Sequence, residues 1–126
     1  MKKFFSTLIL LTLATFLIAG CGENYDKNVM LVREGTLYMA PTVPVGKAFD
    51  QFFTNGTWRS FTSTDNETIV EFKGDCTWND EPARATIQFV INGNEFQAKY
   101  FGINGSGLDD FSAVMSIEKV LDEYKP

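Results

Sequence analysis

The sequence predicts an α+β domain of two layers, in which a four-stranded antiparallel meander carries an N-terminal and a C-terminal helix on one face. Three observations support this fold class. Two neighbouring segments within residues 68–91 alternate apolar and polar side chains, as half-buried strands do. Residues 44–54 and 108–124 instead repeat apolar side chains every three or four positions, as amphipathic helices do.

The first twenty residues have the organisation of a bacterial export signal. Lys2 and Lys3 precede an apolar run that is too short to span a bilayer, which takes about 20 apolar residues. The run ends at Ile18-Ala19-Gly20-Cys21, which resembles the bacterial lipobox. That resemblance implies acylation of Cys21 and cleavage before it, and the alternative is an ordinary signal peptide followed by a chance cysteine. We therefore expect a signal peptide at 1–20, a lipidated tether at 21–28 and a single domain at 29–126.

The charge of the cleaved chain bears on its partners. Of the 11 basic residues, Lys2 and Lys3 leave with the signal, so nine remain against 16 acidic residues and the formal charge becomes −7. Such a surface repels phosphates, which argues against nucleic acid as a partner. Gly22 after the cysteine resembles the sorting pattern of outer-membrane lipoproteins. In a source with two membranes, that resemblance implies an envelope location at the outer membrane, facing the periplasm.

The segments before the central strands are predicted as follows. Residues 29–32 form a short apolar run that we interpret as an edge strand. Pro44 suits the first turn of the helix over 44–54, and Asn55-Gly56 is expected to end it. A strand over 57–62 then leads into the central pair. The apolar side chains assigned to this helix and strand are Val45, Phe49, Phe52, Phe53, Trp58 and Phe61.

The central pair of strands defines the buried face of the sheet, with a turn at Asn79-Asp80-Glu81-Pro82. Side chains on the buried face are Val70, Phe72, Gly74, Cys76, Trp78, Ala83, Ala85, Ile87, Phe89 and Ile91. Side chains on the opposite face include Glu71, Lys73, Asp75, Arg84, Gln88 and Val90. We expect Phe49, Phe72, Phe89 and Trp78 to share one core between the sheet and the helices.

The last strand and helix follow a hairpin turn at Asn92-Gly93-Asn94. The strand over 95–103 has an ambiguous alternation, because Phe96, Ala98 and Tyr100 compete with Phe101 and Ile103 for the inner face. Residues 104–107 read as a flexible connection, and Ser106 or Asp109 is expected to cap the closing helix. The stripe predicted for that helix is Phe111, Val114, Ile117, Leu121 and Tyr124.

Several classes of chemistry have no support in the sequence. The chain contains no histidine, which removes Ser-His-Asp triads, Cys-His pairs and histidine metal sites. The paired carboxylates at Asp80-Glu81 and Asp109-Asp110 are sequence neighbours in a turn or in a first helical turn, where they do not face each other across a cleft. Cys76 lies on the apolar face and is expected to be a buried hydrophobic residue. We expect no catalytic residue, no metal site and no cofactor.

The sheet face without helices is the candidate partner surface, because it combines polar groups with apolar ones as interfaces do. The sequence thus favours a non-enzymatic, membrane-anchored module that binds another envelope protein. One alternative is a small inhibitor of an envelope enzyme, acting through residues 79–81 or 104–107. Another is a hydrolase whose site is assembled from Asp, Tyr and Lys. The residues predicted for the partner face are Arg84, Gln88, Val90, Lys99, Phe101 and Ile103.

Four runs in the chain carry a resemblance to a known kind of domain. They are Val45-Gly46-Lys47-Ala48-Phe49-Asp50-Gln51-Phe52-Phe53, Trp58-x-x-Phe61, Val70-x-Phe72-x-Gly74 and Ile87-Gln88-Phe89-Val90. Together they resemble an uncharacterised bacterial envelope domain of lipoproteins and of membrane-anchored proteins with an amino-terminal zinc ribbon. The resemblance covers residues 29–124, although Pro44 stands where a capping Thr or Ser is expected and no zinc ribbon is present. It implies a recurring extracytoplasmic module without an assigned activity.

Overall fold

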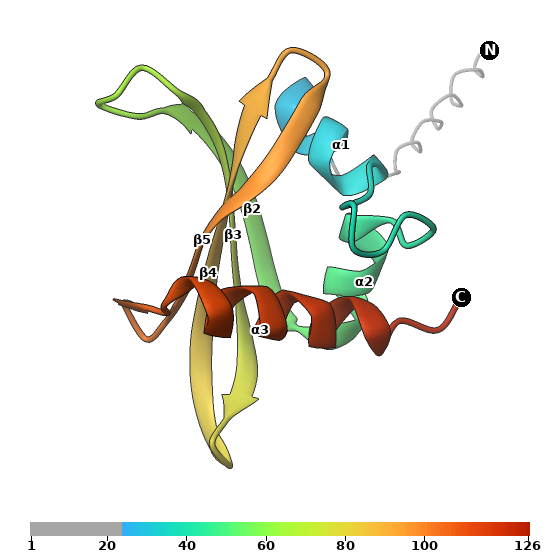
Figure 1. The fold of residues 1–126 in the computed structure, drawn as a ribbon, viewed down its shortest axis with the longest axis vertical. Coiled ribbons are helices and arrows are strands. Elements are labelled where there is room, and N and C mark those ends of the chain that lie inside the picture. Colours follow the sequence, from blue (N-terminus) through green and yellow to red (C-terminus); the bar gives the residue numbers. More distant parts are fainter. Residues whose placement is uncertain (1–23) are drawn as a thin grey trace, which may run out of the picture.

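The computed structural model describes residues 24–126 and shows an antiparallel sheet with three helices packed on one face (Figure 1), which confirms the predicted α+β class. Cys21 lies outside the described residues. The helices are α1 (Lys27–Glu34), α2 (Val45–Phe52) and α3 (Asp110–Asp122). The strands follow the order β2 (Thr54–Thr62), β3 (Thr68–Trp78), β4 (Glu81–Asn92), β5 (Glu95–Ile103) and β6 (Ser106–Gly107) across the sheet.

Helix α1 replaces the edge strand predicted over residues 29–32, so that prediction is wrong. Asp26 caps the helix, because its Oδ1 accepts a hydrogen bond from the backbone N–H of Val29 at 2.9 Å. Val29 and Val32 lie one turn apart and are both buried. The Asp26 carboxylate also accepts a hydrogen bond from the Ser60 hydroxyl at 2.6 Å, which ties the start of the helix to β2. The folded domain therefore begins within the expected tether.

Helix α2 forms close to its predicted position and is joined to α1 by an ion pair. Pro44 occupies the N-cap, and Phe49 is fully buried on the inner stripe. The guanidinium of Arg33 donates two hydrogen bonds to the carboxylate of Asp50, at 2.8 and 3.1 Å. The helix ends earlier than predicted, because β2 already begins at Thr54. Asn55, expected to end the helix, instead adopts a φ of 53° at an irregularity in β2.

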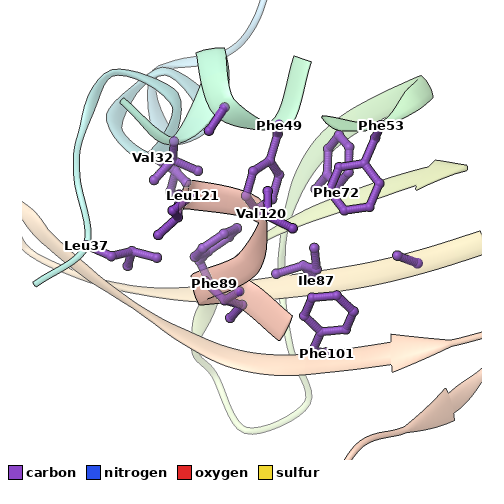
Figure 2. Close-up of a cluster of buried hydrophobic side chains, with 14 of the residues drawn as sticks. Val32, Leu37, Phe49, Phe53, Phe72, Ile87, Phe89, Phe101, Val120 and Leu121 are labelled. Carbon is purple, nitrogen blue, oxygen red and sulfur yellow. The ribbon is translucent and has the colours of Figure 1, made fainter. Parts of the chain in front are cut away.

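The core lies between the sheet and the helices, and its central aromatic residues are those predicted (Figure 2). Phe49 of α2 meets Phe72 of β3 edge-on, with ring centroids 4.9 Å apart. Phe89 of β4 is also fully buried, and Trp78 at the end of β3 is half-buried against the same cluster. These positions confirm the face assigned to the central strands.

The fourth strand of the predicted meander contains a β-bulge at Lys99. Gln88 lies opposite Tyr100 and Phe89 lies opposite Ala98, so Lys99 is an additional residue without a partner in β4. The extra residue shifts the alternation by one position. As a result Phe96 and Ala98 before it, and Phe101 and Ile103 after it, all pack on the core face. The ambiguous alternation in the sequence is thus resolved by a bulge.

The last two elements differ from the prediction in extent. Ser106 and Gly107, predicted within a flexible connection, form β6 beside the end of β5. Asp109 caps α3 by accepting a hydrogen bond from the N–H of Ser112 at 2.7 Å. In the C-terminal half of α3 the predicted stripe is buried, as at Ile117. Within residues 24–126, no helix is both long and apolar enough to cross a membrane.

Candidate binding groove

A hollow of about 810 Å³ opens between β5, α3 and the loop that follows α1. Figure 1 shows where β5, α3 and the end of α1 lie in the fold. For comparison, small-molecule sites in proteins have volumes of about 300 to 1,000 Å³. We call this hollow the β5–α3 groove. Its lining consists of residues 35–39, residues 94–100, Leu31, Asp110, Ala113, Val114 and Ile117.

The floor of the β5–α3 groove is apolar because the core face of β5 is incompletely covered there. Phe96 and Ala98 point to the core side of the sheet, and both are only partly buried. Leu37 and Ile117 complete the floor from the loop and from α3, and both are buried. The groove is therefore an opening into the edge of the hydrophobic core.

Two exposed apolar side chains, Tyr38 and Val114, line the groove, and two more, Phe111 and Met115, are exposed next to Val114 on α3 without lining it. Tyr38 is 87% exposed and Phe111 is 75% exposed, and Val114 and Met115 are exposed as well. The three residues of α3 follow an i, i+3, i+4 spacing, so they share one face of the helix. Phe111 and Val114 were predicted in the buried stripe, and that prediction is wrong, because the side chains that α3 buries are Ile117, Val120 and Leu121 in its later turns.

The charged residues at the groove leave its rim acidic. Glu95 and Asp110 line it together with one basic residue, Lys99. Lys99 forms an ion pair with Glu67, and this hydrogen bond raises the pKa of the Lys99 ammonium above its ordinary value. Because the charge of Lys99 is compensated by Glu67, the two carboxylates dominate the rim.

The groove runs along the outer edge of β5 as well as over its face. A hollow above one face of a strand would be lined by alternate residues, because successive side chains point to opposite faces. Here seven consecutive residues, 94–100, line it. In the described part of the chain, β6 is the neighbour of β5 on this side, and it pairs with Gly102 and Ile103 alone. The backbone edge from Glu95 to Tyr100 therefore borders the groove.

Only some of the residues predicted for the partner face lie on the open face of the sheet. Phe101 is 3% exposed and Ile103 is 8% exposed, and both belong to the core, so their assignment to the open face is wrong. The cause is the bulge at Lys99, which inverts the alternation of the strand after it. Arg84, Gln88 and Val90 do lie on the sheet face opposite the helices, through their registers with β3.

A hydrogen-bonded row crosses that open face from β2 to β4. Glu71 is buried, with 7% of its side chain exposed, and its carboxylate accepts hydrogen bonds from Arg59 at 2.8 Å and Gln88 at 2.7 Å. Burial raises the pKa of the Glu71 carboxyl, but these hydrogen bonds and the charges of Arg59 and Lys73 outweigh it, so the pKa lies below its ordinary value. The row fixes three neighbouring strands in register.

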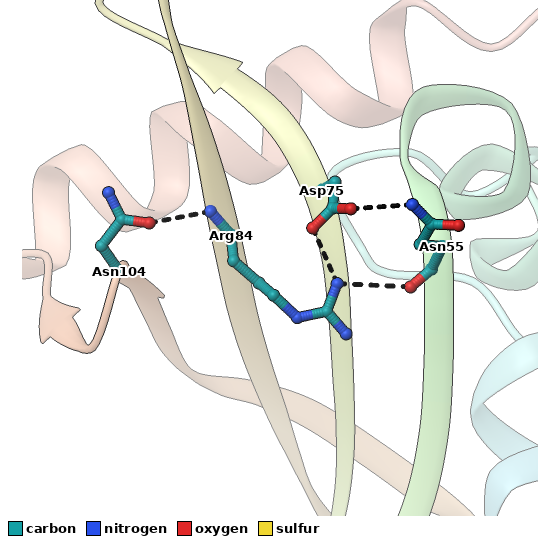
Figure 3. Close-up of polar contacts among 4 residues, drawn as sticks. All are labelled: Asn55, Asp75, Arg84 and Asn104. Atoms are coloured by element: carbon teal, nitrogen blue, oxygen red, sulfur yellow. Dashed lines mark hydrogen bonds and ion pairs between the residues drawn. The ribbon is translucent and has the colours of Figure 1, made fainter.

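A second row lies near the other end of the same strands (Figure 3). The guanidinium of Arg84 donates to the Asp75 carboxylate at 2.8 Å and to the backbone carbonyl of Asn55 at 3.3 Å. The Asn55 amide donates to the same carboxylate at 2.9 Å, and the N–H of Arg84 donates to Oδ1 of Asn104 at 2.9 Å. The hydrogen bonds from Asn55 and Arg84 lower the pKa of Asp75. The guanidinium of Arg84 is thus already bonded to groups of β2 and β3.

The remaining candidate for chemistry is Cys76, which lines a smaller hollow of about 190 Å³ beside Phe53 and Val120. Burial, followed by the charge of Asp75, raises the pKa of the Cys76 thiol above its ordinary value. These conditions favour the neutral thiol over the nucleophilic thiolate. Among residues 24–126, no three acidic or cysteine side chains are grouped so that they could hold a metal ion.

Comparisons of this chain with models of protein families, with curated proteins and with solved structures found no match. The geometry of the chain itself is therefore the basis for assigning a function. Of the two surfaces considered, the open face of the sheet has Glu71, Gln88, Asp75 and Arg84 paired with one another or with β2. The β5–α3 groove combines an apolar floor, the exposed aromatic side chain of Tyr38 and a strand edge.

Proposed function

We propose that this chain is a membrane-anchored bacterial lipoprotein whose extracytoplasmic domain binds another envelope protein and catalyses no reaction. The observation that carries the proposal is the β5–α3 groove, where Tyr38 and Val114 are exposed beside an apolar floor. Grouped exposed apolar side chains bordered by polar ones mark interaction sites in soluble domains. Tyrosine, the residue type at position 38, is also enriched where binding energy is concentrated.

The groove is a better binding surface than the open face of the sheet. On the open face, Arg84 is bonded to Asp75, and Gln88 is bonded to Glu71. A partner would have to replace these contacts, so the net gain from each new hydrogen bond would be small. At the groove, burial of Tyr38 and Val114 would displace water from exposed apolar surface, which is favourable in proportion to its area.

Anchoring would place the domain close to the lipid surface. Asp26 already caps the first helix, so no more than a few residues separate Cys21 from the folded domain. Metabolic labelling with a radioactive fatty acid tests the anchor, and the labelled protein is expected to lose its label in the Cys21→Ser variant. Retention of the label in that variant would contradict lipidation at this residue.

Site-specific crosslinking in the native envelope tests the binding function. A photo-reactive amino acid replaces Val114 at the groove, and in a control chain it replaces Thr77, which is exposed on the open face of the sheet. We expect one discrete crosslinked protein from position 114 and none from position 77. The same product from both positions, or no product from position 114, would contradict binding at the groove.

A further inference from the structure

We propose that the β5–α3 groove binds an extended, basic segment of the partner protein, which pairs with the outer edge of β5 as an additional strand. This inference rests on the proposed function and names the kind of segment that the groove would take. It differs from binding by a lipid chain or a folded surface, because the recognised groups are main-chain N–H and C=O groups.

The register of β4 and β5 directs backbone groups of β5 toward the groove. The two strands are joined by a two-residue turn, Gly93 and Asn94, so the flanking residues Asn92 and Glu95 exchange hydrogen bonds with each other. Bonding then alternates along the antiparallel pair. Phe96 and Ala98 therefore point their N–H and C=O groups away from β4, toward the side on which an added strand would lie.

The chain itself already uses the continuation of this edge for strand pairing. Ser106 and Gly107 pair with Ile103 and Gly102, and the N–H of Leu108 donates to the carbonyl of Phe101 at 2.8 Å. The position beside β5 is thus occupied up to Phe101, and it continues as the groove from Tyr100 back to Glu95. An extended peptide can bond to this edge, whereas an acyl chain would leave its polar groups unpaired.

The side chains around the edge indicate which residues the segment would carry. Alternate side chains of an added strand would point to the core side, onto the apolar floor beside Phe96 and Ala98. The rim carries Glu95 and Asp110, while Lys99 is paired with Glu67. These charges complement lysine or arginine, in line with the net charge of −5 of the whole chain.

Selection from a peptide library tests this inference with the full chain held in lipid nanodiscs. The probe is a phage-displayed library of random peptides of about 12 residues, longer than a strand of typical length. Empty nanodiscs remove peptides that bind lipid. We expect the selected peptides to alternate apolar and polar residues and to contain more Lys and Arg than Asp and Glu. Failure to select any such peptide would overturn the inference.

N-methylation of a selected peptide then tests main-chain pairing without changing the protein. Two versions of the peptide are made, one with N-methyl groups at its odd-numbered residues and the other at its even-numbered residues. Only one of these two versions loses the N–H groups that face β5. We expect that version to bind about tenfold more weakly in fluorescence anisotropy, and the other version to bind normally, since each lost hydrogen bond contributes modestly. The Ala98→Pro variant, which removes one outward N–H, should weaken the unmodified peptide similarly. Equal binding by both methylated versions would overturn strand pairing.

A charge reversal with a matched control tests the preference for basic peptides. In one variant Glu95→Lys and Asp110→Lys reverse the rim, and in the other Asp80→Lys and Glu81→Lys make the same charge change at exposed positions around the turn between β3 and β4, away from the groove. We expect about tenfold weaker binding for the first variant and a much smaller change for the second, since nearby charges dominate at physiological salt. Equal weakening would overturn rim recognition.

The Ala98→Pro variant and the selected peptides also distinguish two other possible occupants of the groove. Concentration-dependent dimers that Ala98→Pro dissociates would identify a second copy of this chain, and peptides that bind as helices would identify a helical partner. Either result overturns the inference while leaving a crosslinked partner at position 114 as evidence for the proposed function. Loss of that crosslink would instead contradict the proposed function itself.

Discussion

A β-carbon on Gly35 would lie 2.5 Å from Cε1 of Phe96, so the residue that ends α1 packs its backbone directly against a ring of β5. The N–H of Gly35 donates to the carbonyl of Val32 at 3.2 Å, and its own carbonyl accepts from the N–H of Val45 at 3.0 Å. These bonds hold the junction between α1 and α2 in place. The close approach therefore positions the wall of the β5–α3 groove relative to its floor.

Replacing Gly35 with alanine should destabilise the fold by crowding Phe96. Overpacking in a core typically costs about 1 to 3 kcal/mol. We expect a loss of this size in the free energy of unfolding, measured by urea denaturation. In the Phe96→Leu background, where the ring is absent, Gly35→Ala should be less damaging. Equal losses in both backgrounds would show that the contact is not the cause.

Two phenylalanines that differ in burial provide a matched comparison of core and surface. Phe89→Ala removes a ring from the centre of the core and should cost about 3 to 5 kcal/mol. Phe111→Ala makes the same chemical change at an exposed position and should alter stability by no more than about 0.5 kcal/mol. Denaturant unfolding measures both variants, and similar losses would place Phe111 in a buried contact.

Stability should fall in acid in part through Glu71. Because its pKa is lower in the folded chain than in the unfolded chain, the ionised carboxylate stabilises the fold above the ordinary pKa of about 4.3. That contribution is lost as the pH falls through the lowered pKa. We expect Glu71→Gln to reduce the free energy of unfolding at pH 7 and to make its decrease in acid shallower. Glu81→Gln, in an exposed position, should leave the acid profile unchanged.

The cap of α1 predicts a graded response at Asp26. Asp26→Ala removes the acceptor for the N–H of Val29 and should cost about 1 kcal/mol. Asp26→Asn keeps a capping oxygen and should retain most of the stability. Hydrogen exchange would localise the effect, with faster exchange expected in the first turn of α1 for the alanine variant. Unchanged exchange there would indicate that the helix does not depend on its cap.

Local patterning explains which parts of the fold are predictable from the sequence. The strands over residues 68–91 alternate without interruption, so each side chain is assigned to the correct face, including Phe72 and Phe89. The inner stripe of α2 is equally regular. The apolar run at residues 29–32 is too short to distinguish a strand from a helix by periodicity. The cap at Asp26 was the available signal for α1, and it lay outside the run used to interpret that segment.

The bulge at Lys99 shows where sequence patterning is insufficient. Both halves of β5 present apolar residues to the core, but in opposite phases, and an extra residue reconciles them. The sequence therefore shows that the alternation changes phase within this strand. It does not show that a bulge causes the change, because the bulge is defined by the register with β4. That register decides whether Phe101 is a partner residue or a core residue, and the structure places it in the core.

By itself, the sequence determined the fold class, the two faces of the central strands and the inner stripe of α2, because these follow from side chains a few residues apart. Only the tertiary structure decided which turns of α3 are covered, and hence that Phe111 and Val114 are exposed. It also decided that Tyr38 and β5 line the same groove, although β5 follows Tyr38 by about 60 positions in the sequence. A groove forms where three distant segments fail to cover one another, and that mismatch depends on twist and register, which no local pattern encodes.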